Sequence, residues 1–116
     1  MLMHEGSIAR NIIDYVQKVA EENHINTVKK IVVKLGKLHA VVPDALLFFF
    51  DIMKKEEKIV EDAVLHLEEE EIVVRCKNCG NEFSVGDRYF VCPACGSPDT
   101  EIIKGGDILI VSVEGE

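Results

Sequence analysis

Two pairs of cysteines constrain this sequence more than any other feature. Cys76 and Cys79 lie in CKNCG, Cys92 and Cys95 lie in CPACG, and twelve residues separate the pairs. Two such turns bring four thiolates to one point and form the tetrahedral S₄ set that suits Zn²⁺. A glycine follows each second cysteine, where the turn needs a permissive backbone. The spacing predicts a structural zinc site with all four cysteines as ligands.

Other uses of four cysteines fit the sequence less well. Two disulfides require an oxidising compartment, and no secretory apolar segment opens the chain. A redox CxxC centre normally begins a helix in a βαβ unit, and that pattern is absent here. Iron in the same S₄ cage, as in rubredoxin, remains an alternative because the ligand set suits both metals. Four protein ligands leave no open coordination position, which favours a structural role over a catalytic one.

Length and charge limit the class of protein. The chain has 116 residues, enough for one modest domain or for a small domain carrying a smaller module. Its longest apolar stretch, Ala45–Phe50, is too short to span a bilayer, so no membrane segment is expected. A net charge of −8 disfavours nucleic acid, because a phosphate backbone requires a basic face. Free thiolates for metal indicate a reducing, cytoplasmic location.

Hydrophobic periodicity predicts an α+β fold. A helix is expected after Ser7 as N-cap, and a half-buried strand over Val28–Leu35. A second helix is expected from Pro43, and a long strand over Ala63–Val74 that leads into the first cysteine pair. A last strand is expected over Ile108–Val113. The prediction is two helices packed on a small β-sheet, with an inserted Cys₄ zinc-ribbon module.

The same order of elements predicts two domains. Residues 1–74 together with 104–116 would form an α+β domain, and residues 75–103 a zinc-binding domain. About thirty residues cannot build a sufficient hydrophobic core, so zinc would replace one. An exposed sheet edge beside the insertion would permit a homodimer, or domain exchange through hinges near Arg75 and Lys104.

One histidine differs from the other three. His4 lies almost at the start of the chain and is followed by Glu5. An imidazole beside unconstrained backbone amides offers a nitrogen-rich, square-planar ligand set that favours Ni(II) or Cu(II) over Zn(II). Any flexible tail can carry such a histidine without binding metal, so this residue alone does not identify a site.

Several short motifs follow one another in order along the whole chain. The first is Met3-His4-Glu5, which precedes a helix that opens with Ser7-Ile8-Ala9. The strand end Val32–Gly36 comes next, and then Val42–Leu46, which Phe48 and Phe50 follow. The two CxxC pairs come after these, and Gly106–Ile110 before Glu114 closes the series. In this order and spacing the sequence resembles the HypA family, the nickel metallochaperones of [NiFe]-hydrogenase maturation. The resemblance covers essentially the full chain.

The resemblance implies a nickel carrier that is not an enzyme. His4 and Glu5 would lie at the nickel site and supply the imidazole nitrogen and main-chain amides. Cys76, Cys79, Cys92 and Cys95 would hold structural zinc. Such proteins pass Ni(II) to the [NiFe]-hydrogenase large subunit and cooperate with a HypB-type GTPase, and some also serve urease maturation. The acidic surface would then either complement a basic patch on a protein partner or only aid solubility.

One departure from the family concerns the first two residues. The family usually begins at the methionine of its MHE motif, so that the terminal amine can join the nickel ligands, whereas Met1-Leu2 precede Met3 here. If translation starts at Met3 the amine is a ligand, and if Met1-Leu2 is retained the amine is displaced.

Two alternatives from other classes remain open, a nucleic-acid-binding zinc ribbon and a rubredoxin-like electron-transfer module.

Overall fold

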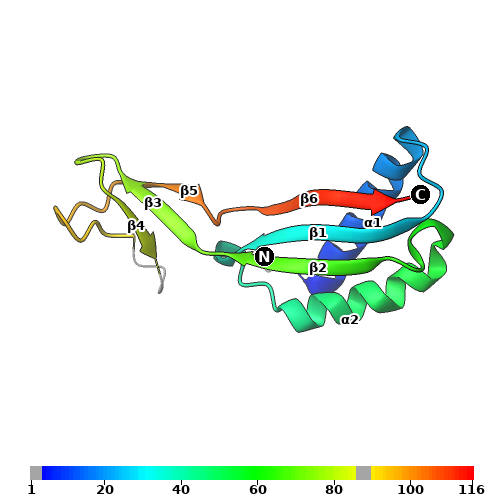
Figure 1. Cartoon of the computed structure of the whole chain (residues 1–116). Coiled ribbons are helices and arrows are strands. Elements are labelled where there is room, and N and C mark those ends of the chain that lie inside the picture. The colour runs from blue at the N-terminus through cyan, green and yellow to red at the C-terminus, as the bar shows by residue number, and fades with distance from the viewer. Residues whose placement is uncertain (1–3, 86–89) are drawn as a thin grey trace. The chain divides into compact units, whose positions relative to one another are not determined.

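The structure is a computed structural model that describes residues 4–85 and 90–116, and the chain divides into two compact units (Figure 1). The first unit comprises the chain up to Lys34, then Val41–Glu68 and Leu109–Glu116. The second unit comprises Leu35–Ala40 and Glu69–Ile108. The sequence-based division assigns nickel binding to one domain and zinc binding to the other. That assignment of metals to domains stays a prediction.

Two helices and one sheet form the first unit. The helices are α1 (Glu5–Glu22) and α2 (Pro43–Met53), and the strands, in spatial order, are β2 (Val64–Glu70), β1 (Val28–Gly36) and β6 (Ile108–Gly115). Figure 1 shows β1 between its two neighbours, with α1 passing behind the sheet. Single 3₁₀ turns cover Lys54–Glu56 and Lys58–Val60, after α2. The predicted α+β class is confirmed.

The apolar periodicity of these elements explains why they pack. One side of α1 is buried, alternate residues of β1 are buried from Ile31 onward, and α2 buries Leu46 and Phe50 one helical turn apart. Full burial of side chains of this size stabilises the fold by about 1.5–3 kcal/mol each. The core of the first unit therefore lies between the helices and the sheet.

The second unit is a three-stranded antiparallel sheet of order β4-β3-β5, preceded in the chain by a 3₁₀ turn over Lys37–His39. Its strands are β3 (Ile72–Cys76), β4 (Glu82–Val85) and β5 (Thr100–Lys104). Among the described residues of this unit, the buried cluster contains Ile72, Val74 and Val85, with Leu38, Phe83 and Phe90 packed against it. On β3, Arg75 forms ion pairs with Glu82 of β4 at 2.9 Å and Glu101 of β5 at 3.6 Å. Such a small core requires an additional source of stability.

Two predictions about element boundaries were wrong. Helix α1 begins at Glu5 with His4 as its N-cap, so Ser7 lies inside the first turn and is not the cap. An acidic residue in that turn complements the helix dipole, which favours the earlier start. The predicted strand Ala63–Val74 is two strands, because β2 ends at Glu70 and β3 begins at Ile72 in a different sheet. A long β-prone run does not reveal where its pairing partner changes.

Other expectations are confirmed. Strand β1 and the start of α2 at Pro43 lie where the sequence predicts them, and β2 and β6, which flank the cysteine module in the chain, belong to one sheet. Strand β5 was not predicted, because its sequence TEIIK is short and largely polar. Among residues 4–85 and 90–116, no helix is long and apolar enough to cross a membrane.

Candidate metal sites

The two cysteine pairs form turns with the same hydrogen-bond pattern. In the first turn, the N–H of Gly80 donates to the carbonyl of Cys76 at 2.8 Å, and the N–H of Cys76 donates to the carbonyl of Asn81 at 2.8 Å. Gly80 has a φ of +79°, a backbone conformation that glycine adopts without steric cost. The turn therefore points two thiols to the same side.

The second turn repeats this arrangement. The N–H of Gly96 donates to the carbonyl of Cys92 at 2.8 Å, and the N–H of Cys92 donates to the carbonyl of Ser97 at 2.9 Å. Gly96 has a φ of +76°. In both pairs the first cysteine is buried and the second is exposed. The two turns thus present equivalent pairs of ligands from opposite sides of one point.

The distances between the sulfur atoms test whether zinc fits. The Sγ atoms of Cys76 and Cys95 lie 3.6 Å apart, as do those of Cys79 and Cys92, and the four Sγ atoms all lie within 4.8 Å of one another. A tetrahedron with Zn–S bonds of about 2.3 Å has sulfur–sulfur edges of about 3.8 Å. All four cysteines are free of disulfides. The cluster is consistent with structural zinc, and it brings together all four predicted ligands.

Held this close, the thiols do not ionise alike. The backbone hydrogen bond at Asn81 lowers the pKa of Cys79, but neighbouring thiols and desolvation outweigh it and raise that pKa to about 12. Desolvation raises the pKa of Cys92. Hydrogen bonds from the backbone of Cys95 and Ala94 and from the side chains of Cys79 and Asn81 outweigh this effect and lower the pKa to about 6. A bound cation favours the thiolate form of every ligand, so binding displaces the remaining protons.

Two asparagines beside the thiols were missed by the sequence analysis. The side-chain amide of Asn78 donates to the Sγ of Cys95 at 3.6 Å, and that of Asn81 donates to the Sγ of Cys92 at 3.8 Å. Each asparagine thus links one cysteine turn to a sulfur of the other. Donors of this kind orient thiolates and stabilise their charge. The only signal in the sequence was the position of both asparagines within the CKNCGN segment.

The predicted nickel residues lie at the start of α1. His4 is exposed and is the N-cap of the helix, and its carbonyl accepts the N–H of Ile8 at 3.1 Å. Glu5 is half-buried, and its carboxylate accepts a hydrogen bond from the N–H of Val42 at 3.0 Å. This hydrogen bond lowers the pKa of Glu5, which stays ionised at neutral pH. Met1–Met3, on which the question of the terminal amine depends, lie outside the described residues.

An open hollow of about 720 Å³ lies beside these two residues. The residues that line it come from the first turns of α1 and the second half of α2: His4, Glu5, Gly6, Ser7, Arg10, Asn11, Phe49 and Met53. It is partly polar, on the α1 side, and partly apolar, on the α2 side. A ligand held at His4 would be accessible to another molecule through this hollow.

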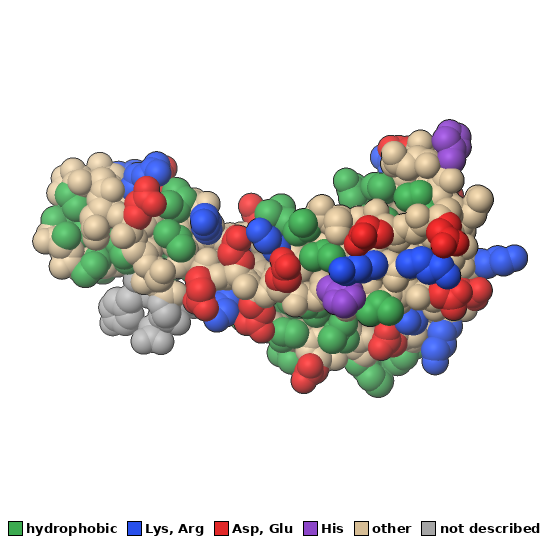
Figure 2. All heavy atoms as spheres, viewed as in Figure 1, with side chains coloured by type: hydrophobic (Ala, Val, Ile, Leu, Met, Phe, Trp, Pro, Cys, Tyr) green, Lys and Arg blue, Asp and Glu red, His purple; other side chains and the backbone are tan. Residues whose placement is uncertain are grey.

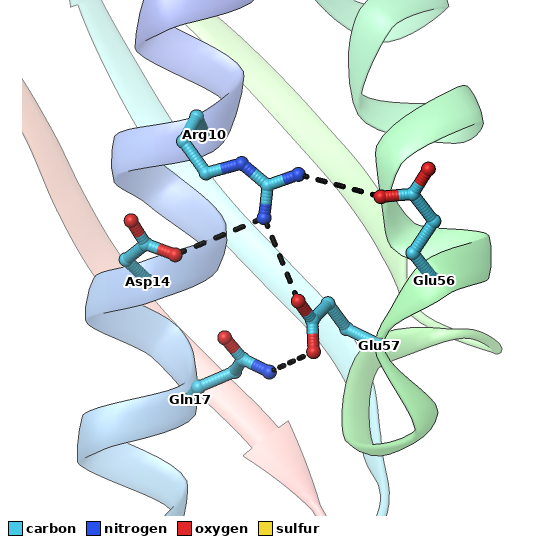
Figure 3. Close-up of polar contacts among 5 residues, drawn as sticks. All are labelled: Arg10, Asp14, Gln17, Glu56 and Glu57. Atoms are coloured by element: carbon cyan, nitrogen blue, oxygen red, sulfur yellow. Dashed lines mark hydrogen bonds and ion pairs between the residues drawn. The ribbon is translucent and has the colours of Figure 1, made fainter.

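An ion-pair cluster holds α1 against the segment that follows α2 (Figure 3). The guanidinium of Arg10 lies 3.8 Å from Asp14, 3.9 Å from Glu56 and 3.7 Å from Glu57, and the amide of Gln17 donates to Glu57 at 2.9 Å. These contacts are partly exposed, so each contributes little alone. Together they orient the helix that carries His4.

Comparison with protein families gives a match over nearly the whole chain. The model of the family described as "Hydrogenase/urease nickel incorporation, metallochaperone, hypA" matches residues 3–115. The hydrogenase maturation factor HypA of Aquifex aeolicus is 37% identical over 114 residues, with 98% of each chain covered. That of Chlorobium phaeobacteroides is 39% identical over 111 residues, covering 96% of this chain and 97% of the relative.

A solved structure resembles the fold as well. The solution structure of the Ni metallochaperone HypA from Helicobacter pylori superimposes with a TM-score of 0.75 at 26% identity, and the match covers 97% of both chains. The match therefore extends over both compact units.

Proposed function

We propose a nickel site from one premise, that this chain belongs to the HypA family of hydrogenase/urease nickel-incorporation metallochaperones. In this proposal, His4 and Glu5 form the site from which the chain delivers Ni(II). The family assignment makes the chain a nickel metallochaperone for hydrogenase maturation and confirms that it is a carrier and not an enzyme. Its four-cysteine cluster is consistent with structural zinc. The assignment of individual residues to nickel is our own.

The position of His4 is the observation that carries this proposal. Its imidazole is exposed at the N-cap of α1, next to backbone N–H groups of the first turn, which have no backbone carbonyl acceptor within the helix. Deprotonated amides of His4 and Glu5 together with the imidazole nitrogen would give the nitrogen-rich set that suits Ni(II). Because this site lies at an open surface, its ligands can be surrendered to a deeper site in an acceptor.

The cysteine cluster has a different task in this proposal. All four of its positions are filled by Cys76, Cys79, Cys92 and Cys95, so the metal there has no open position for exchange. The buried cluster that the described part of the second unit forms, Ile72, Val74 and Val85, is too small to stabilise it alone. Zinc would supply the missing stability, and this division of tasks keeps the nickel cargo apart from the resident metal.

The partners follow from the family. We propose that the acceptor is the [NiFe]-hydrogenase large subunit, that a HypB-type GTPase assists the transfer, and that urease maturation proteins form a second set of partners. We place these events in the cytoplasm, where reducing conditions keep the four thiols available for metal. A nucleic-acid role is disfavoured by the net charge of −8.

X-ray absorption at both metal edges would test the assignment of metals to sites. Protein carrying one zinc and one nickel per chain should show four sulfur neighbours at the zinc edge, and nitrogen and oxygen neighbours with an imidazole signature at the nickel edge. His4→Ala should remove the imidazole signature and leave the zinc spectrum unchanged. Sulfur neighbours around nickel would contradict the proposal, because nickel would then occupy the cysteine cluster.

A further inference from the structure

Helix α2 exposes several large apolar side chains. Phe48 is 60% exposed, Ile52 is 49% exposed and Phe49 is 37% exposed. A solvent-facing helix side normally carries polar residues, and an apolar patch that is left uncovered marks a site of interaction. The rings of Phe48 and Phe49 meet edge to face with centroids 5.6 Å apart, so the patch is a packed surface and not a set of isolated side chains.

Helical spacing places these residues on one continuous strip. Phe48 and Ile52 are one turn apart, and Ala45 and Phe49 lie on the adjacent side of the helix. We call Ala45, Phe48, Phe49 and Ile52 the α2 strip. It lies beside the side of α2 that buries Leu46 and Phe50 in the core, so it is additional apolar surface that the first unit leaves open.

The α2 strip runs into the hollow at the start of α1. Phe49 belongs to both, and Met53 continues the apolar lining toward His4 and Glu5. A Cβ placed on Gly6 would lie 3.7 Å from the ring of Phe49 and 3.8 Å from the methyl group of Met53, so the first turn of α1 rests on these two side chains. A protein that covered the strip would therefore also close over the proposed nickel site.

Acidic residues border the α2 strip. Asp44 and Asp51 are exposed on the side of the helix next to Phe48. Within α2 and the turn that follows it, only the carboxylate of Asp51 has a basic neighbour, because the Nζ of Lys54 lies 3.4 Å from it. Figure 2 shows hydrophobic side chains gathered along the lower edge of the first unit, where Figure 1 places α2, with acidic side chains among them. With a net charge of −8, the chain favours a partner that carries Lys or Arg around an apolar centre.

We propose that the α2 strip is the surface on which the nickel acceptor docks, through apolar side chains over Phe48 and Ile52 and basic side chains facing Asp44 and Asp51. This inference rests on the proposed function, since it names the docking face for the same nickel site. Covering the strip excludes water from the hollow during transfer and holds the acceptor close to His4. A second copy of the chain fits this surface poorly, because its own acidic border and net charge would be repelled.

A matched pair of double variants tests the proposal on the full chain. Phe48→Ser with Ile52→Ser alters the α2 strip, whereas Leu109→Ser with Val111→Ser removes two β6 side chains that are 50% and 52% exposed. Neither pair touches His4, Glu5 or a cysteine. The probe is the nickel-free precursor of the hydrogenase large subunit encoded in the same genome, and the readouts are its affinity and the nickel transferred to it.

Both variants should bind zinc and nickel as the unaltered chain does. We expect the α2 variant to bind the precursor about 10- to 100-fold more weakly and to lose transfer, and the β6 variant to change affinity by less than about twofold. Binding by the unaltered chain should also weaken as salt is raised. Equal affinity of the α2 variant and the unaltered chain, or equal losses in both variants, would overturn the proposal.

Two further outcomes separate this inference from the proposed function. If the unaltered chain binds nickel at His4 but the α2 variant loses only the GTPase or only self-association, the strip has another occupant and the inference is wrong, while the nickel site stands. If His4→Ala binds nickel normally, the proposed site itself is wrong and the inference fails with it.

Discussion

The carboxylate of Glu5 accepts the backbone N–H of Val42 at 3.0 Å, and so joins the first turn of α1 to the N-cap of α2. These residues are 37 positions apart in the chain. The hydrogen bond places the residue that follows His4 at the junction of both helices. The proposed nickel site is therefore tied to the same helix that carries the α2 strip.

Replacing Glu5 with glutamine should reduce the pH dependence of stability. The Val42 N–H lowers the pKa of Glu5 from its usual 4.5, so the ionised form stabilises the folded state above about pH 4.5 and this contribution is lost as pH falls through the folded-state pKa. Glu5→Gln should cost about 0.5 kcal/mol at neutral pH, because the contact is partly exposed and glutamine can still accept the hydrogen bond. Denaturant titration of both proteins measures the difference, which should shrink as the pH falls through the lowered folded-state pKa of Glu5. A difference that stays constant over this range would contradict the account.

Removing one cysteine should unfold the second unit selectively. Cys76→Ala deletes one of four ligands, and structural zinc in small modules contributes about 10–16 kcal/mol of binding free energy. We expect zinc to be lost and the amide signals of β3, β4 and β5 to collapse, while the signals of α1 persist. NMR spectra and zinc analysis measure both effects. Cys79→Ala should behave the same although Cys79 is exposed, and stoichiometric zinc in either variant would refute the four-ligand site.

Two glycine-to-alanine changes should have opposite effects. A Cβ on Gly36 would overlap the carbonyl group of Gly105 and lie 2.6 Å from the carbonyl oxygen of Asp107. Relieving these contacts would require the backbone to shift, which costs more free energy than rotating a flexible side chain. We expect Gly36→Ala to destabilise the protein by about 1–3 kcal/mol. Gly6→Ala meets only contacts of 3.7–3.9 Å inside a helix and should be neutral or stabilising by up to about 1 kcal/mol. Thermal unfolding of the two variants compares them directly, and equal costs would argue against the close approach at Gly36.

Arg10 should contribute a small and salt-dependent stabilisation. Its contacts with Asp14, Glu56 and Glu57 are 3.7–3.9 Å long and partly exposed (Figure 3). We expect Arg10→Gln to cost less than about 1 kcal/mol at low ionic strength and less again in about 1 M salt, where charges are screened within about 3 Å. Lys18→Gln, which removes a positive charge from the exposed side of α1, is the control and should be near neutral. A cost that salt leaves unchanged would assign the effect of Arg10 to packing.

The sequence predicted features that depend on local spacing. The zinc ligands follow from two short CxxC turns, and β1 and α2 follow from periodicity within single segments. Their physical causes lie within a few residues of one another, where a sequence pattern records them directly. The nickel role of His4 and Glu5 is different, because it came from the resemblance to the HypA family and not from local spacing, and it stays a prediction.

Features that depend on distant partners could not be predicted. The break at Glu71 arises because β2 and β3 pair with different strands, and nothing local to Glu68–Glu71 marks that change. The hydrogen bond from Val42 to Glu5 likewise joins segments that only the fold brings together. The place of Phe49 in the lining of the hollow also depends on a distant partner, because α1 supplies the other side of that hollow.

A nickel titration followed by calorimetry and absorption on zinc-loaded protein tests the central claim most directly. The unaltered chain, a version starting at Met3, His4→Ala and, as a matched control, His24→Ala should be compared. We expect one nickel per chain in all except His4→Ala, which should lose high-affinity nickel and keep its zinc. Tighter binding by the Met3 start would make the terminal amine a ligand. Nickel binding by His4→Ala as tight as that of the unaltered chain would contradict the account, because the carrier site would then lie elsewhere.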